Sequence, residues 1–490
     1  MRKINKSSLF TGMLIVLIAV FTGCDHQSLD SSISDTAEMD ALQSEMGAIS
    51  SAEMGVEATD RYIVLAQNNN QLQNIVNRLS SAGATVLHEM SEVGAVIVSA
   101  SGAGFKQNAS AIRGVQSVIP DLKYNFNMPE PKESISINAL DDPPNSGSAD
   151  FFFDLQWGHN AVRAHDAWAE DVRGQGVRVA VLDGGFDLTH PDLVPNINFA
   201  LSTNFVVGEN LQYGLGDTFS HGSHVAGTIA AAENDFGIIG VAPDAELVLV
   251  KVLGDGGSGS FGDVALGILY AASVESKVIN MSLGTAIPQS GIRDAEGNVL
   301  ISAREIAELR VLMNRVNNIA SQSGAVVISA AGNDAFDRDK TSNLITLPAD
   351  MPNVISISAT APIGWATDPD NINLDNLASY SNFGRSAIDF AAPGGDAIYP
   401  GNENCTIAGL LRPCWVFDLV FSTGNQGWYW SAGTSMASPH AAGIAALIIS
   451  ENGGSMKPSQ VEAELRRRAD RIDGTGRSAS FGMGRVNSGY

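Results

Sequence analysis

Apolar segments that alternate with helical stretches constrain the fold of this chain most strongly. The alternation runs from about Phe151 to Tyr490. Runs that are apolar along their whole length are typical of strands covered on both faces, and strand–helix alternation favours a mainly parallel sheet between helices. We therefore predict an α/β fold for residues 151–490, with buried strands at Val177–Leu182, Ala245–Leu253, Val278–Met281, Ala325–Ala330 and Val354–Ile357.

A smaller α+β module is predicted over residues 59–127. Strand-like runs at 61–65, 84–93, 95–99 and 116–124 are interrupted by helical spacing at 71–79 and 105–115. The order β-α-β-β-α-β is the ferredoxin-like arrangement. By itself, such a module is compatible with many binding functions.

The first residues predict a secretion signal. Arg2, Lys3 and Lys6 precede an apolar run, Leu9–Gly23, which is shorter than the ~20 residues of a membrane-spanning helix. We interpret residues 1–23 as a signal peptide. The run ends in Phe-Thr-Gly-Cys24, which resembles the lipobox of bacterial lipoproteins and implies lipidation of Cys24. An ordinary signal peptide with a chance cysteine is the alternative.

Two further segments have the composition of connectors. Residues 24–58 are rich in Ser, Asp, Glu and Ala without a sustained period, which predicts a flexible tether. Residues 128–150 contain four prolines among polar residues, which predicts an extended, exposed linker.

The charge and the cysteine content limit the binding partners and the cellular compartment that are compatible with this chain. The net charge is −24, with 53 acidic and 29 basic residues, which argues against nucleic-acid binding because phosphate contacts need clustered Lys and Arg. If Cys24 carries lipid, Cys405 and Cys414 remain as an even pair. Their spacing in a Gly- and Pro-containing stretch predicts a small disulfide-closed loop in an oxidising compartment.

Three short segments carry the residues of a nucleophilic site. Asp183 ends a predicted strand, His221 opens a helix of small residues, and Ser435 begins another helix, whose N-terminus favours negative charge. Acyl transfer by serine needs such a hydroxyl, a base and a carboxylate that orients the base. Asn333, just after a strand, has an amide that can donate to a developing oxyanion.

These segments, in this order, resemble those of the subtilisin-like serine peptidases over nearly all of residues 151–490. The matching stretches are VLDGGFDLTHPDL (181–193), HGSHVAG (221–227), VKVLGDGGSG (250–259), VINMSLG (278–284), AAGN (330–333) and GTSMASPH (433–440). The resemblance implies a three-layer subtilisin-like fold and a triad of Asp183, His221 and Ser435, with Asn333 in the oxyanion hole. One departure is Gly184, where the family usually has Ser or Thr.

The resemblance also implies sites for substrate and calcium. Peptide substrates would add a strand between two exposed edges, formed by Gly257, Ser258 and Gly259 and by Ser282, Leu283 and Gly284. Phe261 would wall a subsite or pack in the core. Structural Ca²⁺ would be held by oxygens of Gln156, Asp192, Ala232, Asn234, Phe236 and Ile238; an acidic surface loop without an ion is the alternative.

Residues 59–127 resemble the inhibitory propeptide of the same family. The sequence thus predicts a secreted, membrane-tethered serine endopeptidase made as an autoprocessed zymogen, cut between about Asn127 and Asp150. A catalytically silent lipoprotein that binds peptides is the first rival, because Gly184 lacks a hydroxyl. A serine esterase is the second, although its motifs and triad order would differ.

Overall fold

The structure is a computed structural model that describes residues 54–102, 104–126, 128–136, 150, 152–216, 218–474 and 476–490. The expected signal peptide, Cys24 and most of the expected tether lie outside these residues. So does the part of the expected linker that follows Ser136, except Asp150. Within the described ranges, no helix combines the length and apolarity needed to cross a membrane.

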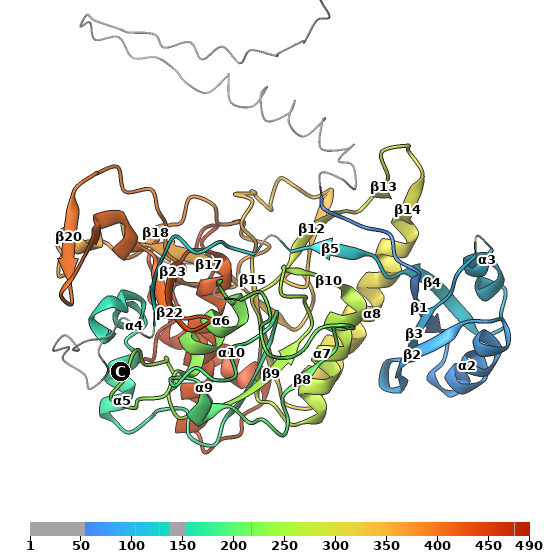
Figure 1. Ribbon diagram of the computed structural model, residues 1–490, viewed down its shortest axis with the longest axis horizontal. Helices are drawn as coiled ribbons and strands as arrows, with labels where there is room; N and C mark the ends of the chain where they lie inside the picture. Colours follow the sequence, from blue (N-terminus) through green and yellow to red (C-terminus); the bar gives the residue numbers. More distant parts are fainter. Residues whose placement is uncertain are drawn as a thin grey trace, which may run out of the picture. The chain divides into compact units, whose positions relative to one another are not determined.

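An eight-stranded sheet organises residues 150–490, which we call the main domain (Figure 1). Its strand order is β18-β17-β15-β11-β7-β9-β8, and β19 also pairs with β17. All pairs are parallel except β17–β18, which confirms the predicted mainly parallel sheet. The strands are β7 (Arg178–Asp183), β8 (Thr203–Asn204), β9 (Glu246–Lys251), β11 (Val278–Met281), β15 (Val326–Ala330), β17 (Val354–Ala361), β18 (Asn376–Leu377) and β19 (Phe390–Pro393).

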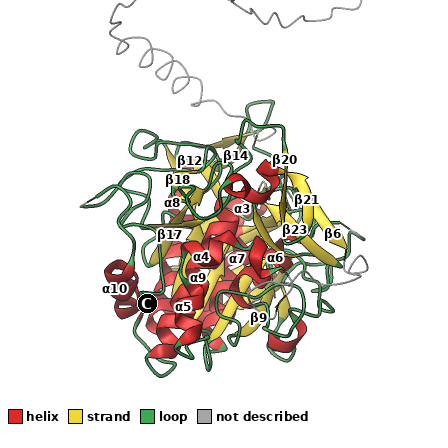
Figure 2. Cartoon of the chain, turned by 90° about the vertical axis from the view of Figure 1, so that its left-hand side faces the viewer, coloured by secondary structure: helices red, strands yellow, loops and turns green. Residues whose placement is uncertain are grey.

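Helices cover both faces of this sheet, as the strand pattern predicts (Figure 2). Along β7, Val179 and Val181 pack in one apolar cluster with α6 (His221–Ala230) and α9 (Thr434–Glu451). The alternate residues Ala180 and Leu182 pack in another cluster with α7 (Phe261–Ser273) and α8 (Ala303–Gln322). These layers make up the predicted three-layer fold. The remaining helices are α4 (Trp157–Ala161), α5 (Ala164–Ala169) and α10 (Pro458–Arg468).

The N-terminal module, residues 59–126, has the predicted ferredoxin-like topology. Its antiparallel sheet has the order β2-β3-β1-β4. The expected last strand, 116–124, is divided: β4 ends at Pro120, because Asp121 turns its carboxylate to the Gly262 N–H at the start of α7 (3.0 Å). The elements are β1 (Arg61–Ala66), α2 (Leu72–Ser81), β2 (Thr85–Met90), β3 (Ala95–Ser99), α3 (Phe105–Ser110) and β4 (Val115–Pro120).

The two faces of the module's sheet have different partners. One face packs on α2 and α3 through Val64, Val96 and Val118. The opposite face belongs to the same apolar cluster as α7 and α8, and it consists of Ile63, Leu65, Ile97 and Ile119. Arg315 of α8 donates to the Val93 carbonyl at 2.9 Å. The main domain therefore completes the core of the module.

Several small antiparallel sheets belong to the main domain in addition to the eight-stranded sheet. The disulfide Cys405–Cys414, with an S–S distance of 2.04 Å, confirms the predicted covalent loop and closes the hairpin β20–β21. The expected exposed linker is partly ordered into a strand, β6, in which Ile135 is buried against the main domain. The paired strands are β12 (Thr285–Pro288) with β16 (Leu344–Leu347), β13 (Gly291–Arg293) with β14 (Val299–Ser302), β20 (Asn404–Ile407) with β21 (Leu410–Pro413), and β22 (Val420–Thr423) with β23 (Gly427–Ser431) and β6 (Glu133–Ser136).

Candidate active site

The carboxyl end of β7 and the first turn of α6 bring Asp183 and His221 together. Asp183 is fully buried, and the Nδ1–H of His221 donates to its Oδ1 at 2.8 Å. The Gly184 N–H donates to the same Oδ1 at 2.7 Å. Within the described chain, Oδ2 of Asp183 has no hydrogen-bond partner. The imidazole is thus oriented by one carboxylate oxygen.

Ser435 lies in the first turn of α9 and is 4% exposed. Its Oγ donates to the Ser282 carbonyl at 3.1 Å, and the Ser282 Oγ donates to the Ser435 carbonyl at 2.7 Å. The Nε2 of His221 has no partner among the described residues. The hydroxyl is therefore turned toward Ser282 and not toward the imidazole.

The amide of Asn333 has a defined orientation. Its Oδ1 accepts hydrogen bonds from the Thr434 N–H at 2.9 Å and from the Thr434 hydroxyl at 2.8 Å. Because both donors require an acceptor, the NH₂ group must be the other end of the amide. It lines the same cavity as Ser435. Asn333 thus presents a donor next to the start of α9.

The chain itself runs into this cavity along the predicted substrate edge. β5 (Lys123–Asn125) pairs antiparallel with β10 (Ser258–Ser260), so that Tyr124 lies opposite Gly259. The Phe126 N–H then donates to the Gly257 carbonyl at 3.0 Å. The Phe261 ring, which is buried, lies 5.0 Å from the Tyr124 ring and 5.7 Å from the Phe126 ring. Phe261 is therefore both a core residue and the wall beside this strand.

Beyond Phe126, the chain passes Ser435. A Cβ added to Gly433 would lie 2.6 Å from the Pro129 Cγ, which shows how closely Pro129 packs on the start of α9. Phe126, Pro129, Glu130 and Lys132 line a cavity together with the second predicted edge and Ser435. The main-domain residues that line it include Leu283, Gly284, Asn333, Asp334 and Thr346.

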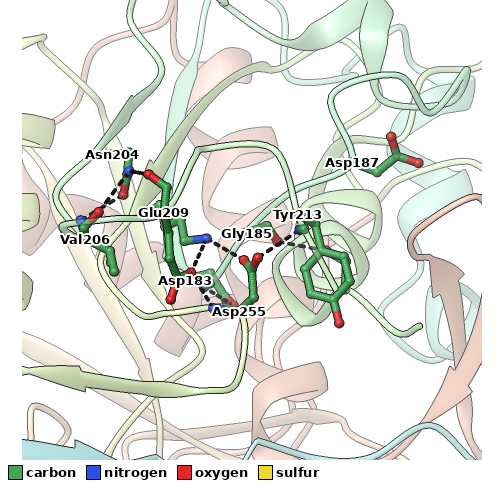
Figure 3. Close-up of polar contacts among 12 residues, drawn as sticks. Asp183, Gly185, Asp187, Asn204, Val206, Glu209, Tyr213 and Asp255 are labelled. Atoms are coloured by element: carbon green, nitrogen blue, oxygen red, sulfur yellow. Dashed lines mark hydrogen bonds and ion pairs between the residues drawn. The ribbon is translucent and has the colours of Figure 1, made fainter. Parts of the chain in front are cut away.

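An ion cluster around the buried Lys251 lies next to the edge that carries β10. Lys251, at the end of β9, is fully buried and forms ion pairs with Glu209 at 2.8 Å and with Asp255. Figure 3 labels Glu209 and Asp255 and draws the polar contacts of this cluster as dashed lines. A Cβ on Gly185 would lie 2.1 Å from Asp255 Oδ1, so the cluster fits only because residue 185 is glycine. The cluster joins the Gly184–Gly185 turn to the substrate edge.

Most of the residues expected at the calcium site lie together, although Gln156 has other partners. Asp192 accepts from Trp428 Nε1 at 2.8 Å and from the Ile238 N–H at 3.0 Å through Oδ2, while its Oδ1 has no partner in the described structure. Burial raises the pKa of Asp192 to about 8. Both amide atoms of Gln156 bond to the backbone of Ile239, at 2.9 and 3.1 Å.

Asp150 is a member of this cluster that the sequence analysis missed. Its Oδ1 accepts from the N–H groups of Asn234 and Phe236, both at 3.2 Å. Burial raises the pKa of Asp150 to about 6, and the charge of Asp150 in turn raises the pKa of Asp192. The sequence gives no motif around Asp150 that would have identified it. No set of three or more His, Cys, Asp and Glu side chains in the described ranges forms a metal cluster.

The other histidines near these motifs bond to backbone. His224 bonds to the Tyr429 carbonyl at 3.0 Å, His440 to the Met436 carbonyl at 2.8 Å and His190 to the Gly427 carbonyl at 3.1 Å. Burial lowers the pKa of His224 to about 3 and that of His440 to about 4. Their roles are therefore structural.

Comparisons with known proteins agree on one family. A family model described as the Subtilase family matches residues 174–484. M-protease of Shouchella clausii (strain KSM-K16) is 35% identical over 337 residues, which cover 68% of this chain and 69% of that protein. Thermitase of Thermoactinomyces vulgaris is 33% identical over 340 residues, or 69% and 96% of the two chains. The crystal structure of the epidermin leader peptide processing serine protease of Staphylococcus aureus has the same fold, with a TM-score of 0.66 at 20% identity over 88% of this chain and 97% of that one.

Proposed function

Because this chain belongs to the subtilase family and is a serine endopeptidase, we propose that Asp183, His221 and Ser435 form its catalytic triad and that Asn333 stabilises the oxyanion. The observation that carries the proposal is the His221–Asp183 hydrogen bond, 2.8 Å long, together with the cavity that Ser435 and Asn333 line in common.

The mechanism follows from these positions. The Ser435 hydroxyl turns from the Ser282 carbonyl to His221, which takes its proton at Nε2 as the oxygen attacks the substrate carbonyl. Asp183 holds Nδ1 and stabilises the imidazolium. The oxyanion accepts hydrogen bonds from the Asn333 NH₂ and from the Ser435 N–H at the start of α9. His221 then protonates the leaving amine, and water hydrolyses the acyl-enzyme by the reverse sequence.

We further propose that residues 59–127 are an inhibitory propeptide. Support comes from the β5–β10 pairing and from Pro129 at Gly433, which together place the connecting chain along the cleft. The first cut would fall between Phe126 and Pro131, near the start of the range expected from the sequence. Ser435→Ala should then accumulate an uncut chain, which mass spectrometry would detect.

A structural Ca²⁺ fits the carboxylates around the loop 232–238. Asp192 keeps one buried oxygen without a partner in the described structure, and the charge of the nearby Asp150 raises the pKa of Asp192. Two buried carboxylates of like charge favour a hard cation, and calcium prefers such oxygen ligands. The proposed donors are Asp150, Asp192 and Asn234 with the carbonyls of Ala232, Phe236 and Ile238; Gln156 would support the site through Ile239. The ion would supply stability and no chemical step.

The sequence of the N-terminus supports secretion and a lipid anchor at Cys24, outside the described residues. The enzyme would then act on polypeptides beyond the cytoplasmic membrane.

One experiment separates this proposal from its rivals. A fluorophosphonate should label Ser435 covalently, and the same preparation should hydrolyse casein; Ser435→Ala should lose both properties. A chain that binds casein but is neither labelled nor active would instead be the silent peptide-binding protein. Labelling together with hydrolysis of esters but not of casein would favour an esterase.

A further inference from the structure

After it has passed Ser435 in space, the connecting chain makes a second strand contact with the main domain, through residues 133–136. β6 pairs antiparallel with β23, with Ile135 opposite Trp428 and Glu133 opposite Trp430. Just before it, the Lys132 N–H donates to the Trp430 carbonyl at 2.9 Å. The connecting chain therefore runs along β10 before it passes Ser435 and along β23 after it has passed Ser435.

Only one side chain of β6 is buried. Ile135 is 7% exposed and belongs to an aromatic cluster with Trp428 and Trp430, whereas Ser134 and Ser136 are exposed. Glu133 lies 3.6 Å from Arg412 of the disulfide hairpin. A short strand held by main-chain bonds and one apolar anchor is the usual form of β-augmentation, in which the backbone gives affinity and the pocket gives selectivity.

Resting on the proposed function, we propose that the outer edge of β23, residues 427–431, is a binding site for the substrate segment downstream of the scissile bond. Its ligand is an extended peptide strand with a branched apolar residue at the place of Ile135. The same chain that enters the cleft along β10, as a substrate would, leaves it along β23. Short peptides that end before this position lack the contact.

Gly427 makes the edge accessible to such a strand. A Cβ on Gly427 would lie 2.3 Å from the Ile135 carbonyl oxygen, and the three nearest atoms that it would meet all belong to Ile135 and Ser136. A larger residue at position 427 would therefore meet this strand first and exclude it. This gives a specific way to close the site.

The first occupant of the site is the chain itself. A cut upstream of Pro131 leaves β6 covalently attached to the main domain, where its effective concentration is far above that of a free substrate. A substrate can therefore bind at β23 only if it displaces β6, or after a second cleavage beyond residue 136 has released β6. Replacing the buried Ile135 by Asp should weaken the binding of β6 to β23 and leave the β23 edge available to substrate.

The test uses the self-processed full-length chain carrying Ile135→Asp. Three internally quenched peptides are compared: a copy of residues 124–136, the same copy with Ile135→Asp, and the same copy with Ser134→Asp as the matched control. We expect the Ile135→Asp peptide to have a KM about tenfold above that of the parent, with kcat unchanged, because one apolar anchor is lost. The Ser134→Asp peptide should behave like the parent peptide.

A second enzyme variant checks the place of binding. Adding Gly427→Ala should raise the KM of the parent peptide to that of the Ile135→Asp peptide. If the Ile135→Asp enzyme does not fold, Ile135→Ser serves in its place. Equal KM values for all three peptides, or no effect of Gly427→Ala, would overturn the proposal.

Failure of the proposed function gives a different result. If neither casein nor any peptide is hydrolysed, the uncut chain keeps residues 132–136 on β23, so the rate at which added trypsin cuts after Lys132 is measured instead. A faster cut in Ile135→Asp and in Gly427→Ala than in Ser134→Asp would support the β23 site in the absence of catalysis, and equal rates in all three variants would refute it.

Discussion

The N–H of Gly184 donates to the Asp183 oxygen that also receives the Nδ1–H of His221, at 2.7 and 2.8 Å. Both bonds thus fall on Oδ1, and Oδ2 is buried without a partner among the described residues. A hydroxyl at residue 184 would be the natural donor to the second oxygen.

Gly184→Ser should raise kcat/KM. A Cβ at this position would lie 3.4 Å from the nearest atom, the Gly254 carbonyl oxygen, which is an ordinary contact. One added hydrogen bond to a buried carboxylate contributes about 1 kcal/mol. If this bond stabilises the transition state, the rate should rise roughly fivefold. Gly184→Ala is the matched control and should not show the gain. An equal gain for both variants would contradict a role for the hydroxyl.

Asn333→Ala should lower kcat with little effect on KM. Loss of such a donor costs about 2.7–4 kcal/mol of transition-state stabilisation, a magnitude known from subtilisin. Because Asn333 also accepts two bonds from Thr434, Asn333→Asp is the informative control: it keeps an acceptor and loses the donor. Both variants should be slow on a peptide substrate. If Asn333→Asp were as active as the parent, Asn333 would not be the oxyanion donor.

Removal of calcium should lower the melting temperature of the Ser435→Ala chain. A ligand present at a hundred times its Kd stabilises the folded state by about 2.7 kcal/mol. Asp192→Asn and Asp150→Asn should each remove most of the difference between melting in EDTA and melting in calcium. Asp154→Asn, an exposed neighbour, should keep it. A calcium effect that is unchanged in both cluster variants would place the ion elsewhere.

The pH dependence of stability should contain a contribution from Asp121, at the junction between the module and α7. Burial raises the pKa of Asp121 to about 6, and the charge of Asp263 adds to this, against the opposing effect of Arg61. The folded-state pKa therefore lies above the unfolded value. The stabilisation that comes from binding this proton is complete below about pH 4 and is lost as the pH rises through 6.

Thermal melting of the Ser435→Ala chain between pH 4.5 and 7 measures this contribution. Relative to the parent, Asp121→Asn should become more stable toward pH 7, by about 1–3 kcal/mol in the free energy of unfolding. Asp60→Asn, at an exposed carboxylate of the same module, should not change the profile. A pH-independent difference between Asp121→Asn and the parent would show that Asp121 ionises normally.

The lipid anchor should depend on Cys24. Cys24→Ala in the Ser435→Ala background should move the protein from the membrane fraction to the soluble fraction, because a lipidated N-terminus is the proposed attachment. The Ser435→Ala background prevents self-cleavage from releasing the enzyme. Retention of the Cys24→Ala chain after a carbonate wash would mean that something other than Cys24 holds it.

The sequence predicts the main fold well because buried parallel strands and the motifs at their carboxyl ends are local patterns. The neighbourhood of Asp183 and His221 follows directly, since one ends a strand and the other begins a helix. Asp150 could not be predicted, because its role depends on a loop more than eighty residues later in the chain. The strand around Ile135 was equally hidden: a single apolar residue among polar ones becomes a strand only because β23 offers it an edge.

The two-sided sheet of the N-terminal module has a further consequence. Its face formed by Ile63, Leu65, Ile97 and Ile119 is covered by the main domain and not by the module's own helices. If the connecting chain is cut and the module departs as proposed, this face would meet water, and the free fragment would lose part of the core that kept it folded. An unfolded fragment would then be a substrate for the enzyme that released it. Activation would therefore proceed in one direction only, because the inhibitor is consumed as it leaves.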